Sequence, residues 1–332
     1  MKRFICALLA VTLLVGVAAC AFGEETGAWK FERPVTIVCP WGAGGGADRT
    51  IRPMAELLTK ILGVDVKVIN IVGHDGANGV EYVYRNPADG YIFLLGTQSM
   101  FMLDMQGITS MNFKTEFLPV ARLVHAVNIF AGSKRAMKEK GYNSFSEMLE
   151  YLKREPGDIN IGMLASTGLD GAVEDQTFKN LEVLAVPYPS GHEMNMALVR
   201  GDVDMIIAGT DELEELIKTG EVVPLLAVSE KRLKKFPDME CTVELGINSV
   251  LGPARGIYAK RGTPEAAIKA LELAVKQASS SQEWQEFLEK GSYDEREAFA
   301  DAQAFAQANE ADYKLLSAYL KDEGKLKINY FK

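Results

Sequence analysis

The hydrophobic pattern of this chain alternates between short apolar runs rich in β-branched residues and longer segments with apolar residues at helical spacing. Residues 35–38 form the first short run, and in residues 49–62 the apolar positions recur three or four apart, as on one face of a helix. Further strands are expected at residues 64–70, 91–95, 160–162, 184–186, 203–207 and 223–228, and further helices at 80–85, 172–180, 193–200 and 213–218. This alternation predicts an α/β fold.

The two ends of the chain are expected to build one domain around a separate middle domain. Two extended segments, near residues 120–130 and 250–259, are the candidates for the two crossings between the domains. The pattern therefore predicts two α/β domains: residues 30–125 with 254–332, and residues 126–253. The tail after Pro264 is predicted to be almost entirely helical, with Thr263 as the cap and Pro264 in the first helical position. Pro53 predicts a bend or a late start in the helix at 49–62.

The first 23 residues are typical of an export signal. Met1-Lys2-Arg3 is basic, and an uncharged apolar run follows up to small residues. Two cleavage sites are consistent with this segment: a lipobox ending at Cys20, which would leave a lipid anchor there, or an ordinary cut after Gly23. Both alternatives place the chain in the periplasm or on the outer face of the cytoplasmic membrane.

Net charge and cysteine content limit the classes of partner and of covalent cross-link that we expect. The full chain carries −9, and loss of Lys2 and Arg3 with the leader takes the charge to −11. Proteins that bind nucleic acid are basic on at least one face, so a nucleic-acid partner is not expected. After export the remaining cysteines are Cys39 and Cys241, and buried free thiols are favoured over a bridge between them.

The most informative stretch for chemistry is Cys39-Pro40-Trp41-Gly42-Ala43-Gly44-Gly45-Gly46-Ala47-Asp48, between the first strand and the first helix. Glycines leave backbone N–H groups uncovered, and the N-terminus of a helix adds positive potential. The stretch therefore predicts an anion site.

Other chemistries have weaker support. The glycine loop also matches a dinucleotide fingerprint, but the second strand ends at Asn70 rather than at the acidic residue that would bind a ribose. The three histidines, His74, His125 and His192, show no metal-ligand spacing. No nucleophile motif is present, so neither an enzyme, a metal nor a cofactor is expected. The glutamates at 212, 214 and 215 are interpreted as a solvated helix face.

Several motifs in order give the chain a family resemblance. It resembles the periplasmic solute-binding proteins of tripartite tricarboxylate transporters, the Tct/Bug type. Each motif alone is weak, but six in register over roughly residues 32–310 are specific. The motifs are Pro40–Arg49, Asn70–Gly79, Pro87–Thr97, Val186–Asp204, Leu226–Asp238 and Gly252–Pro264.

The resemblance implies a two-lobed clamp of the periplasmic-binding-protein type II class. It implies a small di- or tricarboxylate as ligand, held between the lobes, and delivery of that ligand to integral-membrane permease subunits. A monomer is the expected form for a clamp that opens and closes. Two other hypotheses remain: a receptor that presents its ligand to a signalling partner, and an exported α/β enzyme.

Several candidate residues are consistent with either a structural role or a role in ligand binding. Asp48 is expected to cap the first helix, with ligand contact as the alternative. Trp41 and Tyr188 are equally consistent with core packing and with a cleft wall. Arg255 is favoured as a cleft cation, whereas Asp170 would repel a carboxylate unless it caps its helix or pairs with a cation such as Arg255.

The predicted ligand-binding residues combine glycine N–H groups, hydroxyl donors and these mixed positions. They are Trp41, Gly44, Gly45, Gly46, Asp48, Thr97, Gln98, Ser166, Thr167, Gly168, Asp170, Tyr188, Gly209, Thr210 and Arg255.

Overall fold

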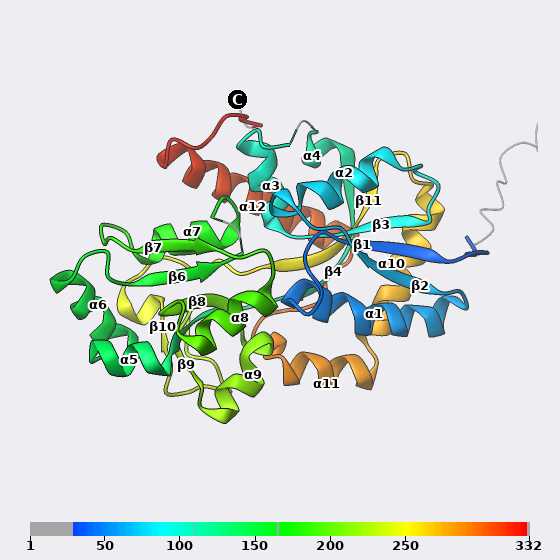
Figure 1. Cartoon of the computed structure of the whole chain (residues 1–332). Helices are drawn as coiled ribbons and strands as arrows, with labels where there is room; N and C mark the ends of the chain where they lie inside the picture. Colours follow the sequence, from blue (N-terminus) through cyan, green and yellow to red (C-terminus); the bar gives the residue numbers. More distant parts are fainter. Residues whose placement is uncertain (1–28, 110, 165, 331–332) are drawn as a thin grey trace, which may run out of the picture.

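Two β-sheets, each flanked by helices, lie side by side in the computed structural model, which describes residues 29–109, 111–164 and 166–330 (Figure 1). The α/β fold predicted from the alternating pattern is confirmed. The leader and Cys20 fall outside the described residues. Within the described part of the chain, no helix has both the length and the apolar content that a bilayer crossing needs.

The first sheet has five strands and the second has six. In spatial order the first contains β2 (Val66–Asn70), β1 (Val35–Cys39), β3 (Ile92–Gly96), β11 (Ala254–Lys260) and β4 (Phe117–His125). The second contains β10 (Glu240–Cys241), β9 (Val222–Ala227), β5 (Asn128–Ser133), β8 (Met205–Gly209), β6 (Asn160–Met163) and β7 (Leu184–Pro187).

The chain passes from the first sheet to the second between β4 and β5, and it returns after β10 to enter β11. We refer to the part built on the first sheet as lobe 1 and to the part built on the second as lobe 2. Strands β1, β2 and β3 are parallel, and β11 runs antiparallel to β3 and β4. Because parallel strands need helical crossovers, the carboxyl ends of β1 and β3 open into loops at one edge of the sheet, where ligands bind in open α/β folds.

Helices cover both faces of each sheet. Lobe 1 carries α1 (Gly46–Leu62), α2 (Ala77–Arg85), α3 (Gln98–Met105), α4 (Phe113–Glu116), α10 (Glu265–Ser279), α11 (Gln282–Lys290) and α12 (Ala302–Asp322). Lobe 2 carries α5 (Lys134–Lys140), α6 (Phe145–Arg154), α7 (Leu169–Thr177), α8 (Gly191–Arg200) and α9 (Thr210–Thr219). Three short 3₁₀ turns, at His74–Gly76, Val243–Leu245 and Tyr293–Glu295, complete the described elements.

The predicted start of the first helix was wrong. Helix α1 begins at Gly46 and runs without interruption through Pro53. An internal proline removes one backbone hydrogen bond, and its ring crowds the carbonyl four residues earlier. The buried face of Ile51, Met54 and Leu58 in the lobe 1 core outweighs that loss. The threonine cap was also displaced, because Pro264 itself is the cap residue of α10 and the Thr263 hydroxyl is buried without a partner.

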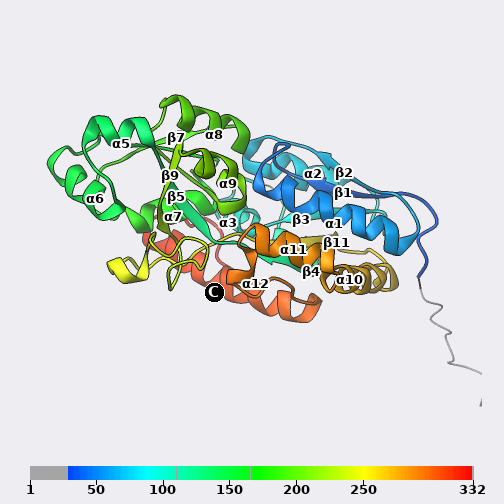
Figure 2. The ribbon, with the colours of Figure 1, turned by 90° about the horizontal axis from the view of Figure 1, so that it is seen from below.

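Helices α7 and α12 tie the two lobes together away from the glycine loop. Leu169 and Ala172 of α7 pack in one apolar cluster with residues of α3 and α12. At the far end of α12, the Tyr319 hydroxyl donates to Asp175 of α7, and Lys325 pairs with the same carboxylate at 2.7 Å. Figures 1 and 2 show α12 running along lobe 1 and reaching α7.

Candidate functional site

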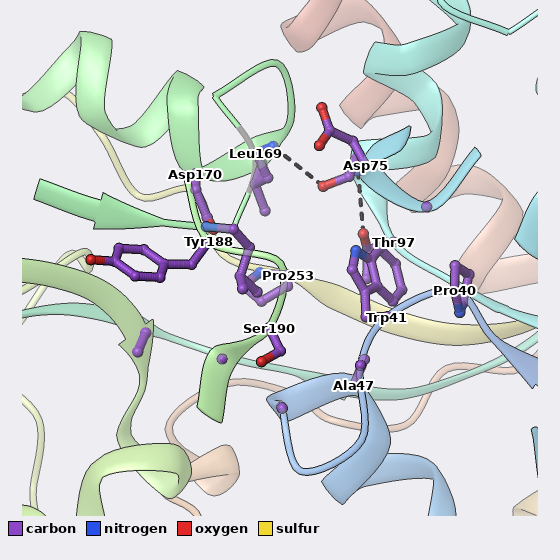
Figure 3. A pocket seen from close by; sticks show the side chains of 18 of the residues that line it. Pro40, Trp41, Ala47, Asp75, Thr97, Leu169, Asp170, Tyr188, Ser190 and Pro253 are labelled. Atoms are coloured by element: carbon purple, nitrogen blue, oxygen red, sulfur yellow. Dashed lines mark hydrogen bonds between the residues drawn. The ribbon is translucent and has the colours of Figure 1, made fainter. Parts of the chain in front are cut away.

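A cavity of about 400 Å³ lies between the lobes. Its lobe 1 wall comes from the loops that follow β1, β2 and β3, together with the start of β11. Its lobe 2 wall comes from the loops that follow β6, β7 and β8. Figure 3 shows Trp41, Thr97 and Asp75 on one side, Tyr188 and Asp170 on the other, and Pro253 between them.

Eight of the predicted ligand-binding residues line this cavity. They are Trp41, Gly45, Gly46, Thr97, Asp170, Tyr188, Gly209 and Arg255. The remaining predicted residues do not line it: Gly44, Asp48, Gln98, Ser166, Thr167, Gly168 and Thr210. The structure thus brings about half of the predicted set together, and a ligand-binding role for each residue stays a prediction.

The residues outside the cavity lining have structural partners of their own. Gln98 accepts from the Ala254 N–H at 2.8 Å and donates to Asp312 at 3.1 Å. Thr210 donates to the Gly291 carbonyl at 2.7 Å, a contact between the lobes. Gly168 caps α7, while Ser166 and Gly44 are exposed. The Thr167 hydroxyl donates to Asp75, another contact between the lobes.

Asp48 organises the glycine loop from inside. Its carboxylate accepts from the Gly44 N–H at 3.0 Å, from Arg52 at 2.8 Å and from Asn70 at 2.8 Å. Burial opposes ionisation of Asp48, but these hydrogen bonds outweigh it and lower its pKa. The expected capping role of Asp48 was wrong, because the cap residue of α1 is Gly45 and Asp48 lies inside the first turn. From there its carboxylate reaches back to the Gly44 N–H, which is thereby already occupied.

The second glycine loop carries unusual backbone angles. Gly73, His74, Asp75 and Gly76 all have positive φ, at 121°, 48°, 56° and 100°. Non-glycine residues rarely adopt this region, and such strain persists where the surrounding structure requires it. The turn carries four cavity-lining residues in succession.

Glu212 is the residue that the sequence interpretation placed wrongly. Its side chain is only 5 % exposed and lines the cavity, whereas that of Glu215 is 80 % exposed. Glu214 is also largely covered, at 12 % exposure, and pairs with Lys218 and Lys235. The expected solvated face is therefore limited to Glu215. A usable signal existed: Glu212 stands three residues after Gly209, and a glutamate at this position can turn back to the N–H of the cap residue, as Glu212 does at 3.4 Å.

Arg255 and Glu212 bring opposite charges together across the two lobes. Arg255 Nη2 lies 3.9 Å from Glu212 Oε1, and both side chains are 5 % exposed. Arg255 Nη1 donates to the Tyr293 hydroxyl at 2.8 Å and to Thr50 at 3.2 Å. Burial raises the pKa of Glu212 and the neighbouring Asp211 adds to this, while the charge of Arg255 and the N–H groups of Gly209 and Gly46 oppose it.

Asp170 is held by groups of its own lobe. The Asn128 amide donates to it at 3.3 Å, and the Leu164 N–H donates to it at 3.4 Å. Burial raises its pKa to about 6, against the opposing effects of the Leu164 hydrogen bond and the charge of Arg255. The expected repulsion between Asp170 and a ligand carboxylate therefore weakens when Asp170 takes up a proton.

Neither thiol is bridged and no metal cluster is formed among the described residues. Cys39 and Cys241 are both free and buried, as favoured from the sequence. Across residues 29–109, 111–164 and 166–330, no three His, Cys, Asp or Glu side chains gather as a metal site would.

Two α/β lobes, two crossings and a cavity between facing loops are typical of a solute-binding protein of the periplasmic type. The family model of the tripartite tricarboxylate transporter family receptor, TctC, matches residues 50–321. The chain belongs to this receptor family.

Relatives and solved structures agree with that assignment. A UPF0065 protein in the gbd 5' region of Cupriavidus necator is 28 % identical over 305 residues, covering 90 % of each chain. A UPF0065 protein of Bordetella pertussis is 28 % identical over 263 residues, covering 77 % of this chain and 79 % of that one. Rpa4515 of R. palustris, solved with adipate, is 25 % identical with a TM-score of 0.81, covering 88 % of this chain and 98 % of that one.

A further structure supports the fold alone. MatC from Rhodopseudomonas palustris, solved with bound malate, is 21 % identical with a TM-score of 0.77 and covers 87 % of this chain and 99 % of that one. The two-lobed fold expected from the sequence motifs is therefore confirmed, and the chain's family is one of receptors rather than enzymes.

Proposed function

We propose that this protein captures a small di- or tricarboxylate in the cavity between its lobes and delivers it to the membrane permease of a tripartite transporter. The observation that carries the proposal is the cavity of about 400 Å³ between facing loops of the two lobes. Its size suits a small organic acid, because ligand cavities bury most of the ligand surface. Two structural relatives were solved with adipate and with malate, which supports the same ligand class.

Lobe closure is the proposed mechanism. The cavity-lining members of the predicted set, Trp41, Thr97, Tyr188 and Arg255 among them, would contact the acid. Loops from both lobes would meet on the ligand and expel water, which lowers the local dielectric and strengthens each polar contact. The contacts between lobes, such as Thr167 to Asp75 and Thr210 to Gly291, would hold the closed form.

The remaining parts of the proposal concern location and assembly. We propose residues 126 and 253 as the boundaries between the two domains, and export of the chain with its leader removed or lipidated at Cys20. We propose that the receptor acts as a monomer, because a clamp must change its shape on each cycle.

Calorimetry tests the proposed ligand class. The protein purified after export would be titrated with mono-, di- and tricarboxylates, including hydroxy- and amino-substituted ones, and with sugars and polyamines. We expect saturable binding of at least one di- or tricarboxylate. Binding of sugars or polyamines with no binding of any acid would overturn the proposal.

A further inference from the structure

We propose that the ligand is an acid that also carries a hydrogen-bond donor, best an ammonium group, and that Glu212 selects for this donor. The inference rests on the proposed function and narrows its ligand class. It makes Glu212 a specificity-determining residue of the cavity, with the unsubstituted diacids as the disfavoured ligands.

The two carboxylate oxygens of Glu212 differ in their surroundings: Oε1 has a hydrogen-bond donor and a nearby cation, whereas Oε2 has no hydrogen-bond partner in the described part of the chain. The Gly209 N–H donates to Oε1 at 3.4 Å, and Arg255 Nη2 lies 3.9 Å from the same atom. Gly46 is close to the same oxygen, since a Cβ atom placed on it would lie 2.6 Å from Oε1. Oε2 is buried, and no described group donates to it. A buried polar atom without a partner loses its hydration and gains nothing in exchange.

Glycines surround this unpartnered oxygen. A Cβ atom placed on Gly191 would lie 2.7 Å from Oε2, and one on Gly45 would lie 3.9 Å from it. Gly45 belongs to lobe 1 and Gly191 to lobe 2, and both line the cavity with Glu212. Oε2 therefore lies where the two lobes meet, beside positions that carry no side chain. In the proposed binding mode the ligand's donor reaches it before the lobes close over it.

The other two carboxylates that line the cavity, those of Asp170 and Asp75, already accept hydrogen bonds from the protein. Asp170 accepts from Asn128 and from the Leu164 N–H, one bond to each oxygen. Asp75 accepts from the Thr167 hydroxyl of the opposite lobe. Among the three cavity carboxylates, Glu212 is thus the one with a buried oxygen left without a donor.

Glu212 also changes what the glycine loop can bind. The Gly44 N–H donates to Asp48, and the Glu212 carboxylate lies against Gly46, so the chain's own carboxylates occupy the start of α1. A ligand carboxylate arriving there would have to displace Glu212. A donor-bearing ligand uses Glu212 as it stands.

The net charge of the cavity lining also favours a ligand that carries an ammonium group. Asp75, Asp170 and Glu212 face one arginine, Arg255, which already lies against Glu212. Burial and Asp211 raise the pKa of Glu212, which shows that its ionised form is incompletely compensated. An ammonium group supplies that compensation, whereas an unsubstituted dianion adds further negative charge.

Matched ligand series test the inference on the exported protein after bound ligand has been removed by unfolding and refolding. The series are succinate, malate and aspartate; glutarate, 2-hydroxyglutarate and glutamate; and tricarballylate and citrate. Within each of the first two series the members differ only in hydrogen, hydroxyl or ammonium at one carbon. In the series whose chain length suits the cavity, we expect binding to tighten about tenfold from the unsubstituted acid to the hydroxy acid, and about tenfold again from the hydroxy acid to the amino acid. A buried hydrogen bond that is left unmade costs about that factor.

Substitution of Glu212 separates selection from simple fit. Glu212→Gln keeps the size and one acceptor but removes the charge, and we expect it to lower the preference for the ammonium over the unsubstituted ligand by at least about tenfold. Glu215→Gln is the matched control, since it lies on the same helix and its side chain is 80 % exposed. The control should leave the preference unchanged.

The outcomes separate this inference from the proposed function. Equal or tighter binding of the unsubstituted acids by the wild-type protein overturns the inference but leaves the proposed function standing. An unchanged preference in folded Glu212→Gln also overturns it. Absence of binding by any acid overturns both. If the variant does not fold, the wild-type ranking alone decides.

Discussion

Arg255 Nη2 of lobe 1 lies 3.9 Å from Glu212 Oε1 of lobe 2, with both side chains almost completely covered. Removing one member of a buried ion pair costs about 3–5 kcal/mol, because the other charge is left without compensation. Here the two members belong to different lobes, so separation of the lobes can return Glu212 to water without unfolding either lobe. The pair thus links the charge balance of the cavity to the closure of the clamp.

We therefore expect Arg255→Met to open the ligand-free clamp. X-ray scattering should show a larger radius of gyration than for the wild-type protein, and calorimetry should show weaker ligand binding. Arg33→Met is the control, because Arg33 pairs with Asp89 at the surface with 56 % of its side chain exposed, and such pairs contribute about 0–1 kcal/mol. Identical scattering for wild type and Arg255→Met would contradict this role of the pair.

The carboxyl group of Asp170 predicts a pH dependence of stability. Burial raises its pKa from 3.8 to about 6 in the folded chain. Between these two values the folded chain holds a proton that the unfolded chain has lost, so this group lowers stability as the pH rises from 4 to 6. The full penalty is present above pH 6 and absent below pH 4. It amounts to roughly 2–3 kcal/mol, because a pKa that moves by one pH unit on folding corresponds to about 1.4 kcal/mol.

Asp170→Asn removes this titration. We subtract the variant's free energy of unfolding from that of the wild type at each pH. This difference should fall by roughly 2–3 kcal/mol as the pH rises from 4 to 7. Urea unfolding at several pH values measures the difference, and the exposed Asp322→Asn serves as the control. A wild-type-to-variant difference that does not vary with pH would show that Asp170 keeps an ordinary pKa.

The sequence predicted the fold well because the fold depends on periodicity. Strands β1, β6 and β7 each end one residue beyond their predicted ranges, because local apolar pattern decides where they lie. Pro53 was overestimated as a helix breaker because the burial of a helix face is a tertiary effect that no local rule contains.

The site was only partly predictable for a related reason. Loops after parallel strands converge at one sheet edge, so Gly45, Thr97 and Gly209 could be placed near the cavity from topology alone. Whether a given polar side chain points into the cavity depends on its tertiary partners. Gln98 turns toward Asp312 and Ala254, whereas Glu212 is drawn across the lobes toward Arg255.

The two buried thiols are expected to be unreactive in the folded protein. Burial raises the pKa of Cys39 to about 12, and burial also raises the pKa of Cys241. Thiol reagents attack the thiolate, so a disulfide reagent at pH 8 should label neither residue until denaturant is added. Both should then react, and a reducing agent should change neither the mass nor the melting temperature. Rapid labelling of Cys39 in the native protein would contradict this burial.

Gly191 predicts a defect in closure that does not depend on charge. A Cβ atom at this position would lie 2.7 Å from Glu212 Oε2 and 3.4 Å from the Gly45 Cα of the opposite lobe. Glu212 cannot move away freely, because the Gly209 N–H donates to its carboxylate and Arg255 lies beside it. Gly191→Ala should therefore weaken ligand binding by about tenfold, close to the 1.4 kcal/mol that one lost polar contact is worth.

The same substitution should leave lobe 2 folded, since alanine at the first position of α8 favours the helix over glycine. Met196→Ala, on the same helix with its side chain partly exposed, is the control for binding. Calorimetry measures the affinity, and thermal unfolding shows that the fold is intact. Wild-type affinity in Gly191→Ala would mean that the clamp binds its ligand without bringing Gly45, Gly191 and Glu212 together, and that the closed arrangement described here is not the one that holds the ligand.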